Sequence, residues 1–342
     1  MSPTLEEVAR LAGVSRSTVS RVINNNPHVR AETRERVWQV IRKSGYQPHA
    51  VARSLVTNRT QIVGMVIPEA VTTLFTDPFF SILLRGATNA CNAHRYQLML
   101  SLFAASADQQ ERYQNLLGNG YLDGVIVASA PLDDPLISNL LHDRVPFVSV
   151  GRHPNRQVHF VDVDNLGGAR MAVEHLIGLG HRRIATITGR LDTTHGQDRQ
   201  EGYRQALEAH LIPVEEGLIV EGDFTESSGM ASMQRLLPAE PTAVFVASDM
   251  MAIGALKALR QAGREVPQDI ALVSFDDMPV ASAIEPALTT VRQSIERMGF
   301  MAVEVLLSLV ESSPEEEAPV HRIVLPTELV VRASCGSTLN RS

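Results

Sequence analysis

The sequence predicts a small all-α module at the N-terminus followed by a larger α/β body, and three observations lead to this fold class. Residues 1–60 contain ten Lys and Arg against four Asp and Glu, a balance of +6, while the remaining residues balance at −13. The first 45 residues show the pattern of three short amphipathic helices, and from Ile62 onward short apolar runs alternate with helical segments. The whole-chain charge of −7 therefore conceals a basic module attached to an acidic one.

Each of the three expected helices has a start or a stop signal. Thr4 opens a capping box at the first helix, which Gly13 ends. Ser15 can cap a second helix, which is broken by the Asn-Asn-Asn-Pro run at residues 24–27. A third helix is expected over about 31–43.

A helix, a glycine-containing turn and a second capped helix make a helix-turn-helix over residues 11–22. This motif places its second helix in the DNA major groove, with the N-terminal residues of that helix towards the base edges. Arg16 and Ser17 hold this position, and Arg21 lies one turn further along the same face, within reach of a base or a phosphate. The alternative is an ordinary helical hairpin on a surface, but the +6 balance of the segment favours DNA binding.

In the body, candidate strands are separated by helical segments of about 10 to 15 residues, which is typical of parallel sheets covered on both faces. About 280 residues are more than one doubly wound sheet needs, so two lobes are expected. The strands are expected to begin near Ile62, Gln97, Gly124, Pro146, His159, Ile184, Leu218, Ala243 and Ile270, with one or two more within 322–331.

The sequence gives no sign of export, membrane insertion or catalysis. Its first residues lack the basic and apolar segments of a signal peptide, and its apolar runs fall far short of the ~20 residues of a bilayer span. Cys91 and Cys335 make no disulfide framework and lack the spacing of metal ligands. Phosphate-loop, zinc-protease and nucleophile-elbow signatures are absent from the sequence. We therefore expect a cytoplasmic protein that has no catalytic residues, cofactor, metal or membrane partner.

A series of short motifs along the chain resembles the signatures of one known family. They are Ala12-Gly13-Val14-Ser15, Thr18-Val19-Ser20-Arg21-Val22-Ile23-Asn24, Gly45-Tyr46-Gln47-Pro48, Ala52-Arg53-Ser54-Leu55, Asp77-Pro78-Phe79-Phe80, Arg199-Gln200-Glu201-Gly202-Tyr203, Ser248-Asp249 and Ser274-Phe275-Asp276-Asp277. In this order they resemble the lactose/galactose repressor (LacI/GalR) family of transcriptional regulators, and the resemblance covers nearly the whole chain.

The resemblance implies a domain organisation in three parts. These are a helix-turn-helix headpiece over residues 1–48, a hinge helix and linker over 49–61, and a two-lobed effector-binding and dimerisation domain over 62–342, similar in fold to periplasmic sugar-binding proteins. The N-terminal lobe is expected to take about 62–161 and 292–322, and the C-terminal lobe about 162–291 and 323–342. The ligand would lie between the lobes, beyond the carboxyl ends of the strands.

On the DNA side, the resemblance implies a homodimer on a near-palindromic operator, because a two-fold protein reads a two-fold site. Leu55 matches a residue that the family inserts between the central base pairs, which bends the duplex; a linker leucine resting on its own core is the alternative. Arg30 stands where relatives often have a serine cap, so the third helix is expected to start more weakly or to gain a phosphate contact. The residues expected at the DNA are Thr4, Ser15, Arg16, Ser17, Thr18, Ser20, Arg21, Asn24, Tyr46, Ala52, Arg53 and Leu55.

On the effector side, the resemblance implies contacts from Asp77, Phe79, Arg152, Arg199, Phe224, Ser248 and Asp276. The guanidinium fork of Arg199 suits vicinal hydroxyls or a carboxylate. Several of these residues have a purely structural alternative: Asp77 as a helix cap, Phe79 and Phe224 as core aromatics, Arg199 as a surface arginine and Asp276 as a turn residue. Gly151 stands where many relatives have an aspartate aimed at the ligand, so either that acceptor is missing or Arg152 replaces it.

Together these features predict a sequence-specific transcriptional regulator, expected to be a repressor, that is controlled by a small-molecule effector. A mono- or oligosaccharide is favoured, because hydroxyl-binding side chains combine with aromatic faces. A purine or nucleoside effector is the alternative within the family. The alternative of a different class is a soluble sugar-binding protein in which residues 1–60 are incidental.

Overall fold

The computed structural model of the chain describes residues 3–23, 26–46, 59–67, 75–102, 121–312 and 319–337. Its contacts divide the chain into two units, Met1–Gln61 with Tyr121–Asp123, and Ile62–Gly120 with Gly124–Ser342. Most of the expected hinge segment, with Ala52, Arg53 and Leu55, lies outside the described residues, and so does Asn24.

The first unit contains the three expected helices, α1 (Leu5–Ala12), α2 (Arg16–Ile23) and α3 (Ala31–Ser44). The capping box of α1 is present, since Thr4 Oγ1 accepts from the Glu7 amide and Glu7 Oε2 accepts from the Thr4 amide. Gly13 ends α1 with φ 63°, a left-handed conformation that favours glycine. Arg30 precedes α3 without a side-chain cap, as expected for an arginine at that position. The core of the unit consists of Val8, Ala9, Ala12, Val19, Val22, Val37, Ile41 and Tyr46.

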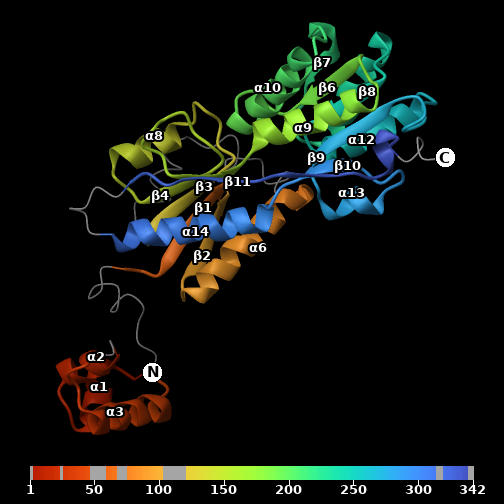
Figure 1. The fold of residues 1–342 in the computed structure, drawn as a ribbon. Helices are drawn as coiled ribbons and strands as arrows, with labels where there is room; N and C mark the ends of the chain where they lie inside the picture. Colours follow the sequence, from red (N-terminus) through yellow and green to blue (C-terminus); the bar gives the residue numbers. More distant parts are fainter. Residues whose placement is uncertain are drawn as a thin grey trace. The chain divides into compact units, whose positions relative to one another are not determined.

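The second unit alternates strands and helices from β1 onward (Figure 1). In chain order it contains β1 (Ile62–Ile67), α6 (Pro78–Ala93), β2 (Gln97–Leu102), β3 (Gly124–Ala128), α8 (Pro135–His142), β4 (Phe147–Val150), β5 (Phe160–Val163), α9 (Asn165–Gly178), β6 (Ile184–Thr188), α10 (Thr194–Ala209), β7 (Ile219–Glu221), α11 (Glu226–Leu236), β8 (Ala243–Val246), α12 (Asp249–Gln261), β9 (Ala271–Asp276), α13 (Pro279–Ala283), β10 (Thr289–Arg292), α14 (Ile295–Glu311), β11 (Arg322–Leu325) and β12 (Glu328–Val330). Among the described residues, no helix is long and apolar enough to cross a membrane.

The strands form two six-stranded sheets, one in each lobe. The first has the order β11-β5-β4-β3-β1-β2 and the second the order β12-β10-β9-β8-β6-β7. Every neighbouring pair is parallel except β10 and β12, which are antiparallel. The predicted α/β class with two doubly wound lobes is therefore confirmed.

The chain crosses between the lobes three times, after β5, after β10 and after β11. Because β5 and β11 belong to the first sheet, the first lobe extends to Val163 and to Leu325, a few residues beyond the ends expected at 161 and 322. The strand β10 was not expected from the sequence. These crossings bring the carboxyl ends of the strands of both sheets towards the junction of the lobes.

Helices cover both faces of the second sheet, because successive side chains along its strands pack alternately on helices of one face and of the other. In β8, Ala243 and Phe245 pack with α9 and α10, while Val244 and Val246 pack with α11 and α12. In the first lobe, α6 and α14 lie side by side and α14 packs on β3, β4 and β5 (Figure 1). Strands buried on both faces have no polar alternation, which is why they stand out as apolar runs in the sequence.

Candidate functional site

The exposed side of α2 carries the residues expected to face DNA bases. Arg16, Ser17 and Arg21 are exposed, while Val19 and Val22 are buried against the other helices. Arg16 Nη1 lies 3.1 Å from Glu6 Oε1, and the two side chains remain 71% and 60% exposed. Such a solvated ion pair contributes little to stability, so Arg16 can exchange this partner for a base or a phosphate at small cost.

Other residues expected at the DNA also support the helices. Ser15 Oγ accepts from the Thr18 amide at 3.1 Å, and it lies 2.8 Å from both Ser17 Oγ and Thr18 Oγ1. Ser20 is half-buried beside them. The Tyr46 side chain is only 6% exposed and packs in the core of the unit, within reach of the charges of Glu6 and Arg16.

A cavity lies between the two lobes of the second unit. Six of the seven residues expected to bind an effector line it, namely Asp77, Phe79, Arg199, Phe224, Ser248 and Asp276. Asp77 also caps α6, where its Oδ1 accepts from the Phe79 amide at 2.9 Å, so the structural and the site role coincide in one side chain. Ser248 does the same for α12, where its hydroxyl accepts from the Met251 amide.

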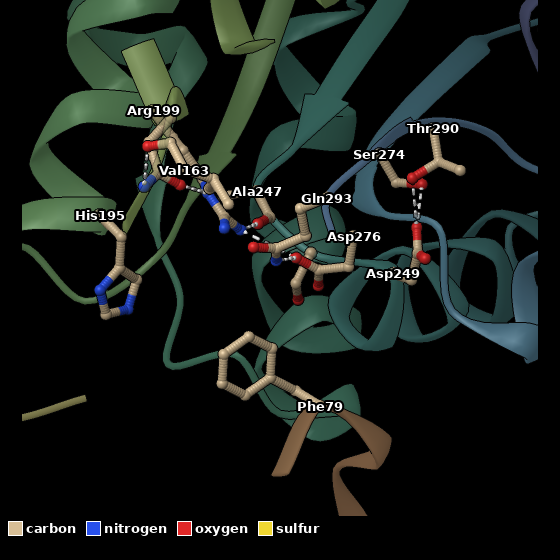
Figure 2. Close-up of polar contacts among 12 residues, drawn as sticks. Phe79, Val163, His195, Arg199, Ala247, Asp249, Ser274, Asp276, Thr290 and Gln293 are labelled. Atoms are coloured by element: carbon tan, nitrogen blue, oxygen red, sulfur yellow. Dashed lines mark hydrogen bonds and ion pairs between the residues drawn. The ribbon is translucent and has the colours of Figure 1, made fainter. Parts of the chain in front are cut away.

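Arg199 is the centre of a buried polar network on one side of the cavity (Figure 2). Its Nε donates to Asn165 Oδ1 at 2.9 Å, and its Nη1 donates to the Ala247 carbonyl and, at 3.3 Å, to Asp276 Oδ1. Gln293 Nε2 also donates to Asp276 Oδ1. The partners of Arg199 lie far apart in the sequence, in α9, directly after β8 and at the end of β9. Arg199 is therefore a buried residue of the second lobe and not a surface arginine.

A second buried carboxylate, Asp249, fixes the backbone that carries Asp276. Asp249 accepts hydrogen bonds from Ser274 Oγ, from Thr290 Oγ1 at 2.8 Å and from the Met278 amide at 2.7 Å. Asp276 has φ 117°, a conformation that an aspartate rarely adopts. The bonds to Asp249 on both sides of Asp276 hold this strained position.

Aromatic rings form another side of the cavity. The Phe224 ring stacks on His195 with a centroid distance of 5.1 Å and an interplanar angle of 35°. Phe224 also lies directly over Gly189, where a Cβ atom would come within 2.0 Å of Phe224 Cζ. From the other lobe, the Phe79 ring points from α6 towards the cavity, below the polar network in Figure 2. The cavity thus combines a hydrogen-bonding side with flat apolar faces.

Burial shifts the pKa values of several groups in the cavity. It raises the pKa of Asp77 to about 7, and the nearby negative charge of Asp276 contributes to the rise. It also raises the pKa of Asp276, against the opposing effect of Arg199. For His195, burial and the positive charges of Arg199 and Arg190 lower the pKa to about 3, so the ring is neutral at physiological pH.

Arg152 is the one expected effector residue that does not line this cavity. Its side chain points to a separate hollow, which it lines together with His153, Arg156 and Arg322, and it forms an ion pair with Asp198. Gly151 does line the cavity, with φ 101°. The expectation that Arg152 replaces a missing acceptor at Gly151 therefore has no support in the geometry.

Sequence reasoning missed several residues of the cavity, among them Asn165, His195 and Gln293. His195 lies four residues before Arg199 in α10, so the helical period places both on one face. Gln293 directly follows β10, a strand that was itself missed. Within the described part of the chain, no group of three or more His, Cys, Asp or Glu could hold a metal ion.

Comparison with known sequences assigns both units to described families. Residues 4–49 match the bacterial regulatory proteins of the lacI family, and residues 173–335 match a periplasmic binding protein-like domain. The HTH-type transcriptional regulator CelR of Thermobifida fusca is 44% identical over 337 residues, covering 97% of this chain and 98% of that protein. The HTH-type transcriptional repressor PurR of Haemophilus influenzae (strain PittEE) is 33% identical over 339 residues, covering 98% and 99%.

Solved structures agree with this assignment over the whole length. A complex of the transcriptional regulator CelR with cellobiose has a TM-score of 0.77 and 41% identity, and covers 97% of this chain and 99% of that one. A lac repressor dimer bound to operator and the anti-inducer ONPF has a TM-score of 0.84 and 27% identity, and covers 98% and 99%.

Proposed function

The chain belongs to the LacI family of bacterial regulatory proteins, and we propose that it binds operator DNA as a homodimer under the control of a sugar bound in its cavity. It is a DNA-binding transcriptional regulator, as its relatives are. The observation that carries the sugar proposal is the cavity itself, where the Arg199–Asp276 network faces the Phe79 and Phe224 rings.

A sugar ring matches this arrangement on two counts. Its vicinal hydroxyls can both donate to the carboxylates of Asp77 and Asp276 and accept from Arg199. Its apolar C–H face can pack on the flat rings of Phe79, Phe224 and His195. A relative of this chain has been solved with cellobiose, a disaccharide. Cellobiose is therefore the first ligand to test.

A purine or nucleoside is the second candidate effector. Its planar base would stack on the Phe224 and His195 rings, and the relative named PurR supports this choice. Sugars and purines differ in the hydrogen bonds that they form with the residues lining the cavity. A sugar forms many through its hydroxyl groups, whereas a purine base forms a few along the edge of its ring. The denser set of carboxylate and amide partners around Arg199 favours the sugar.

For the DNA side, we propose that Arg16, Ser17 and Arg21 meet the bases and phosphates of each half-site. The segment 49–61 would act as hinge helix and linker, and Leu55 as the residue that enters the central base step. Since the family consists of regulators, we assign no catalytic step to the cavity. We propose a cytoplasmic location, where the bacterial operator is.

A thermal-shift screen of sugars and nucleobases, followed by operator binding with each hit, tests the proposal. We expect cellobiose or a related β-linked sugar to raise the melting temperature and to change operator affinity. A purine that stabilises the protein while every sugar fails would replace the sugar as effector. If the full-length protein binds no DNA even at low salt, the regulatory function itself is wrong.

A further inference from the structure

Carboxylates outnumber guanidinium groups in the described wall of the cavity. Asp77, Asp162, Asp223 and Asp276 line it, against two arginines, Arg190 and Arg199. His195 adds no positive charge, because its pKa lies far below neutrality. The described wall is thus net negative when all four carboxyl groups are ionised.

Both arginines are already paired with carboxylates of the same lobe. Arg190 Nε and Nη2 donate to the two oxygens of Asp192 at 3.0 and 2.6 Å, a bidentate pair. Arg199 donates to Asp276 Oδ1, and the charges of Asp162 and Asp249 further stabilise its protonated form. An anion that enters the cavity would therefore have to compete with these built-in partners for positive charge.

Two of the carboxylates approach the cavity from opposite lobes. Asp77 stands at the start of α6 in the first lobe, and Asp276 ends β9 in the second. Burial is the main cause of the raised pKa of Asp77, and the negative charge of Asp276 raises it further. A third negative charge between them would add to this repulsion, because Asp276 is buried and Asp77 half-buried, so that solvent screens the charges only in part.

We propose that Asp77, acting together with Asp276 across the cavity, restricts the effector to uncharged hydroxyl compounds and excludes their acidic derivatives, such as uronic acids and sugar phosphates. A neutral sugar donates hydroxyl hydrogens to both carboxylates and so bridges the two lobes. A carboxylate or phosphate at the same place accepts hydrogens only, and it meets like charge on both sides. This inference rests on the proposed role of the cavity as the effector site.

The chain offers a clean pair of variants to test the role of Asp77. Asp77→Asn removes the charge but keeps the cap of α6, because asparagine caps helices as well as aspartate. Asp134 starts α8 in the same way, with Pro135 next and its Oδ1 accepting from the Leu136 amide at 2.8 Å, but it does not line the cavity. Asp134→Asn is therefore the matched control for a neutralised Asp-Pro helix start.

The main experiment is calorimetry on the full-length protein at pH 8 with ligands that differ only in charge. Cellobiose is compared with cellobiuronic acid, in which one CH₂OH group is a carboxylate. We expect the acid to bind about 100-fold more weakly than cellobiose, the equivalent of two pKa units. Asp77→Asn should narrow this gap about tenfold, and Asp134→Asn should leave it as in the wild type. Equal binding of both ligands, preference for the acid, or a gap that Asp77→Asn leaves unchanged would overturn the proposal.

A ligand-free measurement separates this proposal from the identity of the effector. Because burial and the charge of Asp276 both disfavour ionised Asp77, Asp77→Asn should raise the melting temperature more at pH 8, where Asp77 is ionised, than at pH 5, where it is protonated. Asp134→Asn should show no such difference. If neither sugar binds, the proposal of a sugar effector is wrong. The exclusion of charged ligands is then tested by comparing the affinity for adenosine with that for adenosine monophosphate. Identical melting of wild type and Asp77→Asn at both pH values contradicts the repulsion on which the proposal depends.

Discussion

Replacing Arg199 with lysine keeps a positive charge in the cavity but removes the planar fork that the structure uses. Arg199 donates from Nε to Asn165 and from Nη1 to Ala247 and Asp276, and its guanidinium lies 3.7 Å from the centre of the Phe275 ring. A lysine has one nitrogen, which cannot reach Asn165 and Asp276 together and still face a ligand. A hydrogen bond to a charged group contributes about 1.5–3 kcal/mol, so losing one bond to the effector should weaken its binding by about 10- to 150-fold. Losing the bond to Asn165 should also lower the melting temperature of the free protein by roughly 3–12 °C.

The assay is calorimetric titration with the effector, paired with operator binding followed by fluorescence anisotropy. Arg204→Lys is the matched control, because Arg204 lies on the same helix and pairs with Glu216 at 3.0 Å, outside the cavity. Arg199→Lys should respond only at about 10- to 150-fold higher effector concentration and keep its operator affinity without effector, while Arg204→Lys should match the wild type in both. Wild-type effector affinity in Arg199→Lys would remove Arg199 from the binding site and refute the reasoning.

Three further predictions follow from other parts of the molecule. Gly189→Ala places a Cβ within 2.0 Å of Phe224 Cζ, so the Phe224 ring must move. Effector affinity should then fall at least tenfold, and the free energy of unfolding by about 1–3 kcal/mol. Unchanged effector affinity in calorimetry would exclude Phe224 as a binding face. Arg30→Ser supplies the missing cap of α3 and should stabilise the first unit by about 1 kcal/mol in urea unfolding, whereas no gain would mean that another group already satisfies the helix start. The sugar hydroxyls are proposed to donate to ionised Asp77, whose pKa is raised to about 7. Effector affinity should therefore fall by up to tenfold per pH unit below about pH 7, as Asp77 becomes protonated. An effector affinity that stays constant between pH 8 and 5.5 would contradict this.

The sequence indicated most of the fold because buried parallel strands leave a clear signal. Strands such as β3 and β8 are covered on both faces and appear as unbroken apolar runs. The strand β10 was missed because three of the four residues in its sequence, Thr-Thr-Val-Arg, are polar. Thr289 and Thr290 are nevertheless fully buried. Their hydroxyls can be buried because they donate hydrogen bonds to the Arg332 carbonyl and to Asp249. Partners this distant in the sequence cannot be read from a local pattern.

The candidate site was predicted residue by residue only where a motif marked it. Arg199 and Asp276 stand in recognisable motifs and do meet in the structure. Arg152 was chosen only for its position after Gly151, and its side chain pairs with Asp198 instead of turning into the cavity. His195 carries no motif, but the four-residue spacing to Arg199 could have placed it on the inner face of α10. Tyr46 belongs to a motif, yet its side chain is part of the core.

The central claim is that one chain couples a ligand in the cavity to DNA binding by the helix-turn-helix. The most direct measurement is operator affinity of the full-length protein, on palindromic DNA selected from a random pool, across a range of salt and cellobiose concentrations. We predict a steep loss of affinity with rising salt, as phosphate contacts require, and a shift of affinity with cellobiose that needs about 10- to 150-fold more sugar in Arg199→Lys. A protein that binds cellobiose in the cavity but holds its operator equally well with and without the sugar would contradict the account.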